Sequence, residues 1–278
     1  MSVTQVSHGG QLYAEAAKQG LTEQQALEKW IDFSASIPPW TFRPTAPLNE
    51  LALQHYPDAN HAELMHALQQ RFQIAPEYIS VCNGVSSAIL NLFAYLRPKQ
   101  TTLYAPIFGE YEKVAAAYGS QIQRINRLKD ASLTPYSISD LAKIPVAKNS
   151  LVIWVNPSTP DGQHTDLESM KPLLDLWKQQ NCLVVLDESF LPFIGFDTKL
   201  SGRSLLETWP KLIILQSLTK YYACPGLRVG AVFAHPDFLS QWPQAHWPIS
   251  IVDQKILLQR LNEPSLETQN QALQTQLK

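Results

Sequence analysis

Residues 212–220 read LIILQSLTK, an apolar run that turns polar only in its last residues and finishes on Lys220. Similar runs occur at residues 151–155 (LVIWV) and 182–186 (CLVVL). None of the three alternates strictly between apolar and polar residues, which is typical of strands buried on both faces of a parallel sheet. The chain is therefore expected to contain a sheet that helices cover on both sides.

Strands and helices alternate on either side of these runs. Further strands are predicted at residues 78–82, 101–104, 121–125 and 229–234, and helices at residues 62–72, 86–96, 109–117 and 167–179. Together these segments predict an α/β protein with a mostly parallel sheet.

The two ends of the chain differ from this alternating centre. We expect residues 1–45 to form an N-terminal arm, with a helix near residues 11–18 and a proline-rich stretch at 37–47. Residues 46–240 are expected to form one large domain. Residues 241–278 carry apolar side chains at helical spacing from residue 253 onward, and we interpret them as a separate C-terminal segment.

Composition narrows the class of ligand. The 278 residues are 45% hydrophobic and 17% charged, with a formal net charge of -2, which is typical of a globular protein. Without an excess of Lys and Arg the chain offers no basic field for nucleic acid, so a small molecule is the expected ligand. No apolar run approaches the roughly 18 residues that a membrane span needs, and we expect a cytoplasmic protein.

Cysteines and histidines do not favour a disulfide or a metal site. Cys82, Cys182 and Cys224 form no CxxC pair and are expected to be buried thiols. His61 and His66 are five residues apart, so they do not share a helix face at the i, i+4 spacing. We therefore expect no metal.

Polar segments follow the predicted strands. Because open parallel sheets bind ligands at the carboxyl ends of their strands, these segments are expected to meet at one edge. They are residues 83–87 (NGVSS), 105–109 (APIFG), 156–162 (NPSTPDG), 187–190 (DESF) and 217–220 (SLTK), with Arg228 eight residues beyond the last. Such a set is chemically suited to an anionic, aromatic cofactor.

Lys220 and Asp187 are the two candidate catalytic residues. Each is predicted to lie at the end of an apolar strand. For Lys220, partial burial there would lower the pKa of the side chain and make its amine a nucleophile for an aldehyde. A carboxylate at position 187 could pair with a protonated pyridine nitrogen and keep the ring an electron acceptor. Considered alone, a lysine at position 220 is more often a solvated residue that opens a loop. An aspartate at position 187 could likewise be an ordinary helix N-cap.

The residues near Lys220 suit a phosphate monoester. Ser217 and Thr219 offer hydroxyls and Arg228 a guanidinium, and residues 84–87 open a helix whose free amides attract anions. Phe108 could stack on an aromatic ring, although an aromatic residue after a strand is more often part of the core.

The ordered motifs NPxxPxG (156–162), DExF (187–190), SLTK (217–220) and PGLRVG (225–230) resemble the class I/II aminotransferases of fold type I. Within that superfamily, HGG at 8–10, DFSA at 32–35, HYPD at 55–58 and LTKYY at 218–222 look most like the threonine-phosphate decarboxylases, with the histidinol-phosphate aminotransferases as their nearest relatives. The resemblance covers about residues 6–273. It implies the three-layer large domain of the pyridoxal-phosphate-dependent transferases.

The resemblance also implies roles for single residues. Lys220 would hold pyridoxal 5'-phosphate as a Schiff base, Asp187 would pair with the ring nitrogen, and Phe108 would stack on the ring. The other implied cofactor contacts are Val85, Ser86, Thr159, Ser217, Thr219 and Arg228, with Tyr56 reaching the cofactor of a second subunit in a homodimer. The implied substrate contacts are His8, Gly9 and Ser36.

Some positions depart from the pattern of these enzymes. Thr159 stands where an asparagine usually contacts the phenolic oxygen of the ring, and Phe190 stands where many aminotransferases have a tyrosine. The arm reads SASIPP at residues 34–39 in place of the usual SANINP. The resemblance also implies that residues 46–240 are the cofactor-binding large domain and that residues 241–278 are the start of a truncated C-terminal small domain. In these enzymes the rest of that domain carries an arginine for the substrate carboxylate.

The resemblance therefore implies a decarboxylase of an amino-acid phosphate, converting threonine phosphate to aminopropanol phosphate for cobalamin biosynthesis. A histidinol-phosphate-type aminotransferase is the second interpretation. A chain that binds pyridoxal phosphate without turnover is the third.

Overall fold

The computed structural model describes residues 9–40, 42–45, 53–129, 134–243 and 245–277. Its centre is a seven-stranded sheet with the strand order β1-β9-β8-β7-β6-β2-β3. The strands are β1 (Ile79–Cys82), β2 (Gln100–Ala105), β3 (Gln121–Asn126), β6 (Leu151–Val155), β7 (Leu183–Asp187), β8 (Leu212–Ser217) and β9 (Gly230–Ala234). Only β9 runs antiparallel to its neighbours, so the predicted α/β fold with a mostly parallel sheet is confirmed.

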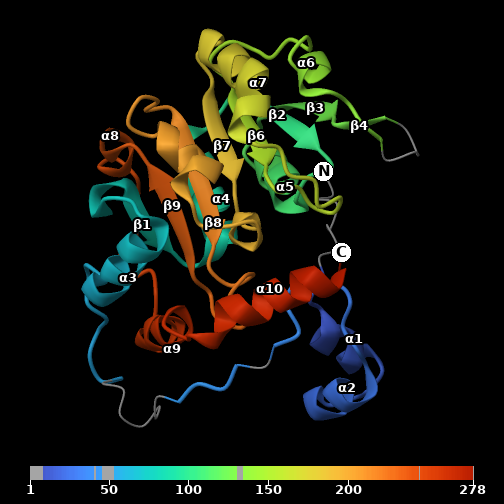
Figure 1. Ribbon diagram of the computed structural model, residues 1–278, viewed down its shortest axis with the longest axis vertical. Coiled ribbons are helices and arrows are strands. Elements are labelled where there is room, and N and C mark those ends of the chain that lie inside the picture. The colour runs from blue at the N-terminus through green and yellow to red at the C-terminus, as the bar shows by residue number, and fades with distance from the viewer. Residues whose placement is uncertain (1–8, 41, 46–52, 130–133, 244, 278) are drawn as a thin grey trace.

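Helices cover both faces of the sheet, as Figure 1 shows. On one face lie α4 (Gly84–Leu96) and α5 (Gly109–Ala117), and on the other α3 (Ala62–Phe72) and α7 (Leu167–Gln179). Successive residues of a strand point to opposite faces, so Ile153 packs under α4 while Trp154 packs toward α7. Both faces of the central strands are therefore buried, which explains their unbroken apolar sequence.

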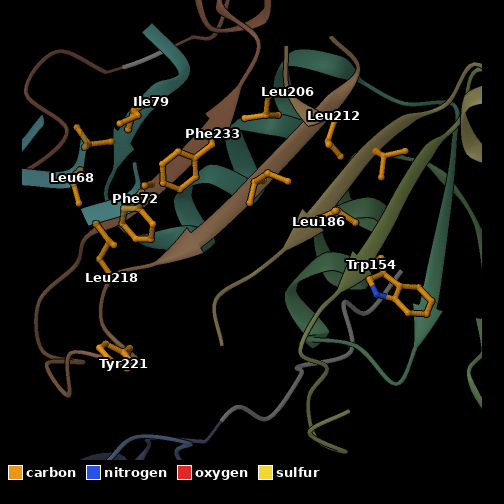
Figure 2. Packing of buried hydrophobic residues seen from close by; sticks show 14 of the residues in the cluster. Leu68, Phe72, Ile79, Trp154, Leu186, Leu206, Leu212, Leu218, Tyr221 and Phe233 are labelled. Carbon is orange, nitrogen blue, oxygen red and sulfur yellow. The ribbon is translucent and has the colours of Figure 1, made fainter. Parts of the chain in front are cut away.

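The larger of the two cores joins α3 and α7 to the sheet. Figure 2 shows Phe72 of α3 beside Phe233 of β9, with Leu68 and Leu218 next to them. The two phenylalanine rings lie 5.1 Å apart at an angle of 60°. Full burial of side chains of this size contributes about 1.5–3 kcal/mol each, so this core fixes α3 against the edge of the sheet.

Short elements connect these layers, and the sequence did not predict them. The helical ones are α2 (Glu23–Lys29), α6 (Ile138–Leu141), α8 (Pro236–Leu239) and the 3-10 turns Pro76–Tyr78, Leu191–Phe193, Thr198–Leu200 and Gly202–Leu205. Strand β4 (Leu128–Lys129) pairs with β5 (Thr134–Pro135) in a separate antiparallel two-stranded sheet. In α2, Thr22 and Gln25 form a capping box, a signal that the sequence carried in its T-x-x-Q pattern.

The two ends of the described chain meet beside the sheet. In Figure 1, α1 (Leu12–Lys18) and α2 stand away from the sheet, while α9 (Ile251–Leu261) and α10 (Ser265–Leu277) pass beneath it. The indole nitrogen of Trp40 donates to Asn270 Oδ1 at 2.8 Å and ties the arm to α10. The single C-terminal helical segment expected from residue 253 is two helices, because Pro264 lies in the break between them.

Two further observations concern the class of protein. The three cysteines are free and buried, as predicted. Across the described part of the chain, no helix combines the length and the apolar character that crossing a bilayer requires. The domain boundaries proposed at residues 45/46 and 240/241 remain predictions.

Candidate active site

A pocket of about 780 Å³ opens at the carboxyl ends of the parallel strands. Strands β2, β6, β7 and β8 all end there, and the helices α4 and α5 begin there. Most of the predicted site residues line it: Gly9, Ser36, Val85, Ser86, Phe108, Thr159, Asp187, Ser217, Thr219, Lys220 and Arg228. The fold thus joins segments that lie more than two hundred residues apart in the sequence.

Asp187 is the last residue of β7 and is 4% exposed. Its Oδ2 accepts a hydrogen bond of 2.7 Å from the hydroxyl of Tyr111, and its Oδ1 accepts one of 3.0 Å from the backbone of Ser189. Burial raises the pKa of Asp187, and these two hydrogen bonds and the charge of Lys220 oppose that rise. Both donors favour the ionised carboxylate, so Asp187 is held in place as an acceptor at the floor of the pocket.

Tyr111 supplies its hydrogen bond from α5, three residues after Phe108. Its side chain is fully buried, and burial together with the neighbouring carboxylate raises the pKa of Tyr111 well above its ordinary value. The phenol therefore keeps its proton and donates. The rings of Tyr111 and Phe108 lie 6.3 Å apart, edge to face, so the same helix turn places both.

Lys220 lies in the turn after β8 and is partly buried. Burial lowers the pKa of Lys220, the positive charge of Arg228 lowers it further, and the charge of Asp187 opposes the change. A lysine with a lowered pKa has a larger neutral fraction near pH 7 and is a better nucleophile and proton carrier.

Two glycines open an anion cradle beside Lys220. Gly84, with φ of +71°, begins α4, and a Cβ on it would lie 2.7 Å from Nη2 of Arg228. A Cβ on Gly230 would lie 3.0 Å from the backbone nitrogen of Val85. The guanidinium and the first amides of the helix can approach a ligand only because neither glycine has a side chain.

Hydroxyl groups complete the cradle. Ser217 Oγ and Thr219 Oγ1 lie 3.0 Å apart, and the backbone nitrogen of Thr219 donates to Ser217 Oγ at 3.3 Å. Ser86 lines the same side of the pocket from the first turn of α4. Backbone amides at a helix N-terminus, three hydroxyls and one guanidinium match the oxygens of a phosphate monoester, so this donor set fits a phosphorylated cofactor.

The walls of the pocket between Asp187 and the opening are largely apolar. Phe108 and Val155 line it from the ends of β2 and β6, and Phe190 lines it after β7. Thr159 lies among them and offers one hydroxyl. Such a slot suits a flat aromatic ring.

One predicted residue among those described, Tyr56, is not in this pocket. Tyr56 is 75% exposed and its ring stacks on Trp247 at 4.1 Å, outside the pocket of its own chain. His8 lies outside the described residues. Gly9 and Ser36 line the mouth of the pocket from the N-terminal arm.

Sequence reasoning missed Tyr111 and Ser189. Ser189 donates from its backbone to Asp187 and accepts from the backbone of Ser217 at its Oγ at 3.1 Å, which joins the turns after β7 and β8. The signal for Tyr111 was its i+3 spacing from Phe108, which puts both on one side of α5.

The model of the aminotransferase class I and II family matches residues 48–278. The chain belongs to the class I and II aminotransferase family. It is 30% identical over 241 residues to the threonine-phosphate decarboxylase of Salmonella typhimurium, covering 85% of this chain and 64% of that one. It is 28% identical over 236 residues to the adenosylcobalamin biosynthesis bifunctional protein CobDQ of Leptospira interrogans, covering 82% and 26%.

A solved structure with the same fold contains pyridoxal 5'-phosphate. The histidinol-phosphate aminotransferase of Sinorhizobium meliloti in complex with pyridoxal 5'-phosphate superposes with a TM-score of 0.65 at 17% identity, covering 80% of this chain and 61% of that one. Pyridoxal phosphate is the cofactor of the family. The chain spans slightly less than two thirds of the length of the Salmonella relative.

Proposed function

We propose that this chain binds pyridoxal 5'-phosphate and decarboxylates a phosphorylated amino acid in the cytoplasm. One observation carries the proposal: a lysine with a lowered pKa, a buried carboxylate and a phosphate cradle face one pocket. A nucleophilic amine, an acceptor for a ring nitrogen and a set of phosphate donors are the three groups that this cofactor requires.

The residues present would hold the cofactor by its three functional parts. The amides of residues 84–86, the hydroxyls of Ser217 and Thr219 and the guanidinium of Arg228 would hold the phosphate. Asp187 would accept from the ring nitrogen and Phe108 would cover one face of the ring. Lys220 would bind the aldehyde carbon through Nζ. When bound, the cofactor supplies an electron-accepting ring that stabilises negative charge on the substrate carbon.

The chain's own groups control the proton and the water. Lys220 Nζ delivers a proton to the substrate carbon after the bond to the carboxylate breaks and carbon dioxide leaves. Tyr111 and Ser189 donate to Asp187 and favour its ionised form against the effect of burial, which raises its pKa. Phe108, Val155 and Phe190 keep water from the slot in which the proton moves.

For the substrate we propose threonine phosphate, with aminopropanol phosphate and carbon dioxide as products, in cobalamin biosynthesis. The two relatives named for threonine-phosphate decarboxylation and adenosylcobalamin biosynthesis support this choice. Gly9 and Ser36 at the mouth of the pocket, together with His8, would contact the substrate's phosphate.

A homodimer follows from the same proposal. Tyr56 and Trp247 form an exposed stacked pair that reaches no part of the pocket in its own chain. In a two-fold assembly Tyr56 would serve the cofactor of the other subunit, so each site would be shared. Analytical ultracentrifugation tests this directly: a dimer supports the proposal and a monomer contradicts it.

Carbon dioxide release tests the reaction. The protein is loaded with pyridoxal phosphate and given threonine phosphate labelled at the carboxyl carbon. We expect labelled carbon dioxide from the wild type, none from Lys220→Ala, and wild-type release from Lys211→Ala. Lys211 is the matched control because it stands exposed at the opposite end of β8, where it donates to Asn181.

The second candidate reaction is transamination, which the histidinol-phosphate aminotransferase structure favours. In that case Lys220 moves the α-proton, no carbon dioxide appears, and 2-oxoglutarate is needed to restore the aldehyde form of the cofactor. Cofactor that binds Lys220 with neither outcome would instead support a binding protein, for which Thr159 in place of the usual asparagine is the motivation.

A further inference from the structure

A buried arginine lies directly behind the wall of the pocket. Arg127 follows β3 at the edge of the sheet and is 6% exposed. Its Nη2 donates to the carbonyl of Pro106 at 2.8 Å, and its Nη1 donates to the carbonyl of Val155 at 3.4 Å. The side chain therefore reaches across the end of β2 to the end of β6.

The two carbonyls belong to the segments that form the apolar slot. Val155 lines the pocket itself, and Pro106 is followed by Ile107 and Phe108, which also line it. The backbone nitrogen of Arg127 donates to the carbonyl of Ala105 at 2.7 Å, so main chain and side chain both hold the end of β2. No other guanidinium among the described residues joins two of these strand ends.

The burial of Arg127 in a low-dielectric site costs desolvation free energy. Its guanidinium lies over the ring of Trp154 at 4.8 Å, and its Nε has no hydrogen-bond partner among the described residues. Burial lowers the pKa of Arg127, and the charge of Asp161 opposes that change. Both carboxylate oxygens of Asp161 are buried without a hydrogen-bond partner in the described structure, so Asp161 acts on Arg127 through its charge and not through a hydrogen bond.

Burying a charged group costs free energy unless hydrogen bonds or an opposite charge compensate it, and the two backbone carbonyls are the only hydrogen-bond partners of this guanidinium among the described residues. We propose that Arg127 is a positioning residue that fixes the distance between the ends of β2 and β6, and so the slot in which the cofactor ring lies. It touches neither cofactor nor substrate, and it acts through Phe108 and Val155. This inference rests on the proposed function, since it concerns the geometry of the bound ring.

Four proteins test it: the wild type, Arg127→Met, Arg127→Lys and the control Arg124→Met. Methionine keeps the volume and removes the charge, and lysine keeps the charge but can donate to only one of the two carbonyls at a time. Arg124 lies within β3, three residues before Arg127, and its half-exposed side chain pairs with Glu112. For each protein we measure the dissociation constant for pyridoxal phosphate, the visible circular dichroism per mole of bound cofactor, and the melting temperature without cofactor.

We expect Arg127→Met to weaken cofactor binding by at least about tenfold and to reduce the visible dichroism, because lost hydrogen bonds to a charged donor are of that size. Arg127→Lys should lie between it and the wild type, and Arg124→Met should match the wild type within about twofold. If Arg127→Met does not fold, the cofactor affinity and visible dichroism of Arg127→Lys test the inference instead.

Wild-type affinity and dichroism in the Arg127 variants, with only a lower melting temperature, would overturn the inference and leave the proposed function intact. A wild-type protein that takes up no pyridoxal phosphate would overturn both.

Discussion

The sheet edge and the N-terminal arm line the same pocket, but they are held in different ways. At the sheet edge Asp187 is 4% and Ser217 is 7% exposed. Asp187 accepts a hydrogen bond from the backbone of Ser189, and the backbone of Ser217 donates one to Ser189 Oγ. In the arm Ile31 is 82% and Phe33 is 90% exposed, and the backbone nitrogen of Gly10 donates to Ser34 Oγ, also in the arm, at 2.7 Å.

This difference separates two parts of the function. Groups at the ends of buried strands take their positions from the core, so the cofactor end of the pocket is preorganised before any ligand arrives. Groups on the arm take theirs from contacts within the arm and from the tie between Trp40 and α10, outside the sheet core. The cofactor is therefore the better determined ligand, and the substrate depends on the less constrained half of the site.

Asp187→Asn tests the preorganised half most severely. The change removes the negative charge next to the ring nitrogen and keeps the size of the side chain. We expect turnover to fall by roughly 10²–10³-fold, the scale of losing one preorganised electrostatic partner. Steady-state kinetics with measured cofactor content checks this, with Asp175→Asn on the exposed side of α7 as the control. Turnover within a few fold of wild type would show that Asp187 does not serve the ring.

Arg228→Met tests the phosphate cradle at the same edge. We expect the affinity for pyridoxal phosphate to fall by about 10–100-fold, because hydrogen bonds to charged groups are worth about 1.5–3 kcal/mol. Pyridoxal, which lacks the phosphate, is the matched ligand, and its binding should change far less. Equal losses for the two ligands in fluorescence titrations would mean that Arg228 does not contact the phosphate.

Tyr111→Phe tests how much the hydrogen bond from Tyr111 stabilises the ionised form of Asp187. The hydrogen bond from Tyr111 lowers the pKa of Asp187, which burial raises, so its removal should raise the pKa of Asp187 further. The carboxylate then protonates at a higher pH, and the acid limb of the pH–activity profile should move upward, with turnover at neutral pH down by about tenfold or less. An unmoved acid limb would contradict the assigned role of this hydrogen bond.

Substitutions in the arm should have the smallest effect on the cofactor. We expect Phe33→Ser, at an exposed position, and Ser36→Ala to change pyridoxal phosphate affinity by less than about twofold, since neither is part of the cradle. Ser36→Ala should raise the KM for threonine phosphate. An arm variant that loses cofactor as severely as Arg228→Met would remove the distinction between the two halves.

Much of the fold could be predicted because the central elements have strong periodic patterns. The strand at residues 151–155 and the helices at 62–72, 109–117 and 167–179 have the predicted bounds. The short elements were missed because a helix such as Ile138–Leu141 is too brief for a repeating apolar pattern.

The candidate site could be predicted in part for a related reason. The carboxyl ends of parallel strands must meet at one edge, so the segments at residues 187–190 and 217–220 were expected to lie together, and they do. The side-chain contacts that other elements make with the ends of the strands could not be predicted. The bond from Tyr111 to Asp187 and the reach of Arg127 to Val155 depend on how a helix and an edge strand pack on the sheet.

Borohydride reduction of the cofactor-loaded protein tests the central claim most directly. Borohydride fixes pyridoxal phosphate wherever an amine holds it, and peptide mapping then identifies the modified lysine. We predict a visible absorption band that reduction abolishes and a single phosphopyridoxyl group on the peptide that contains Lys220. A protein that takes up no cofactor, or one labelled on another lysine such as Lys211, would contradict the account.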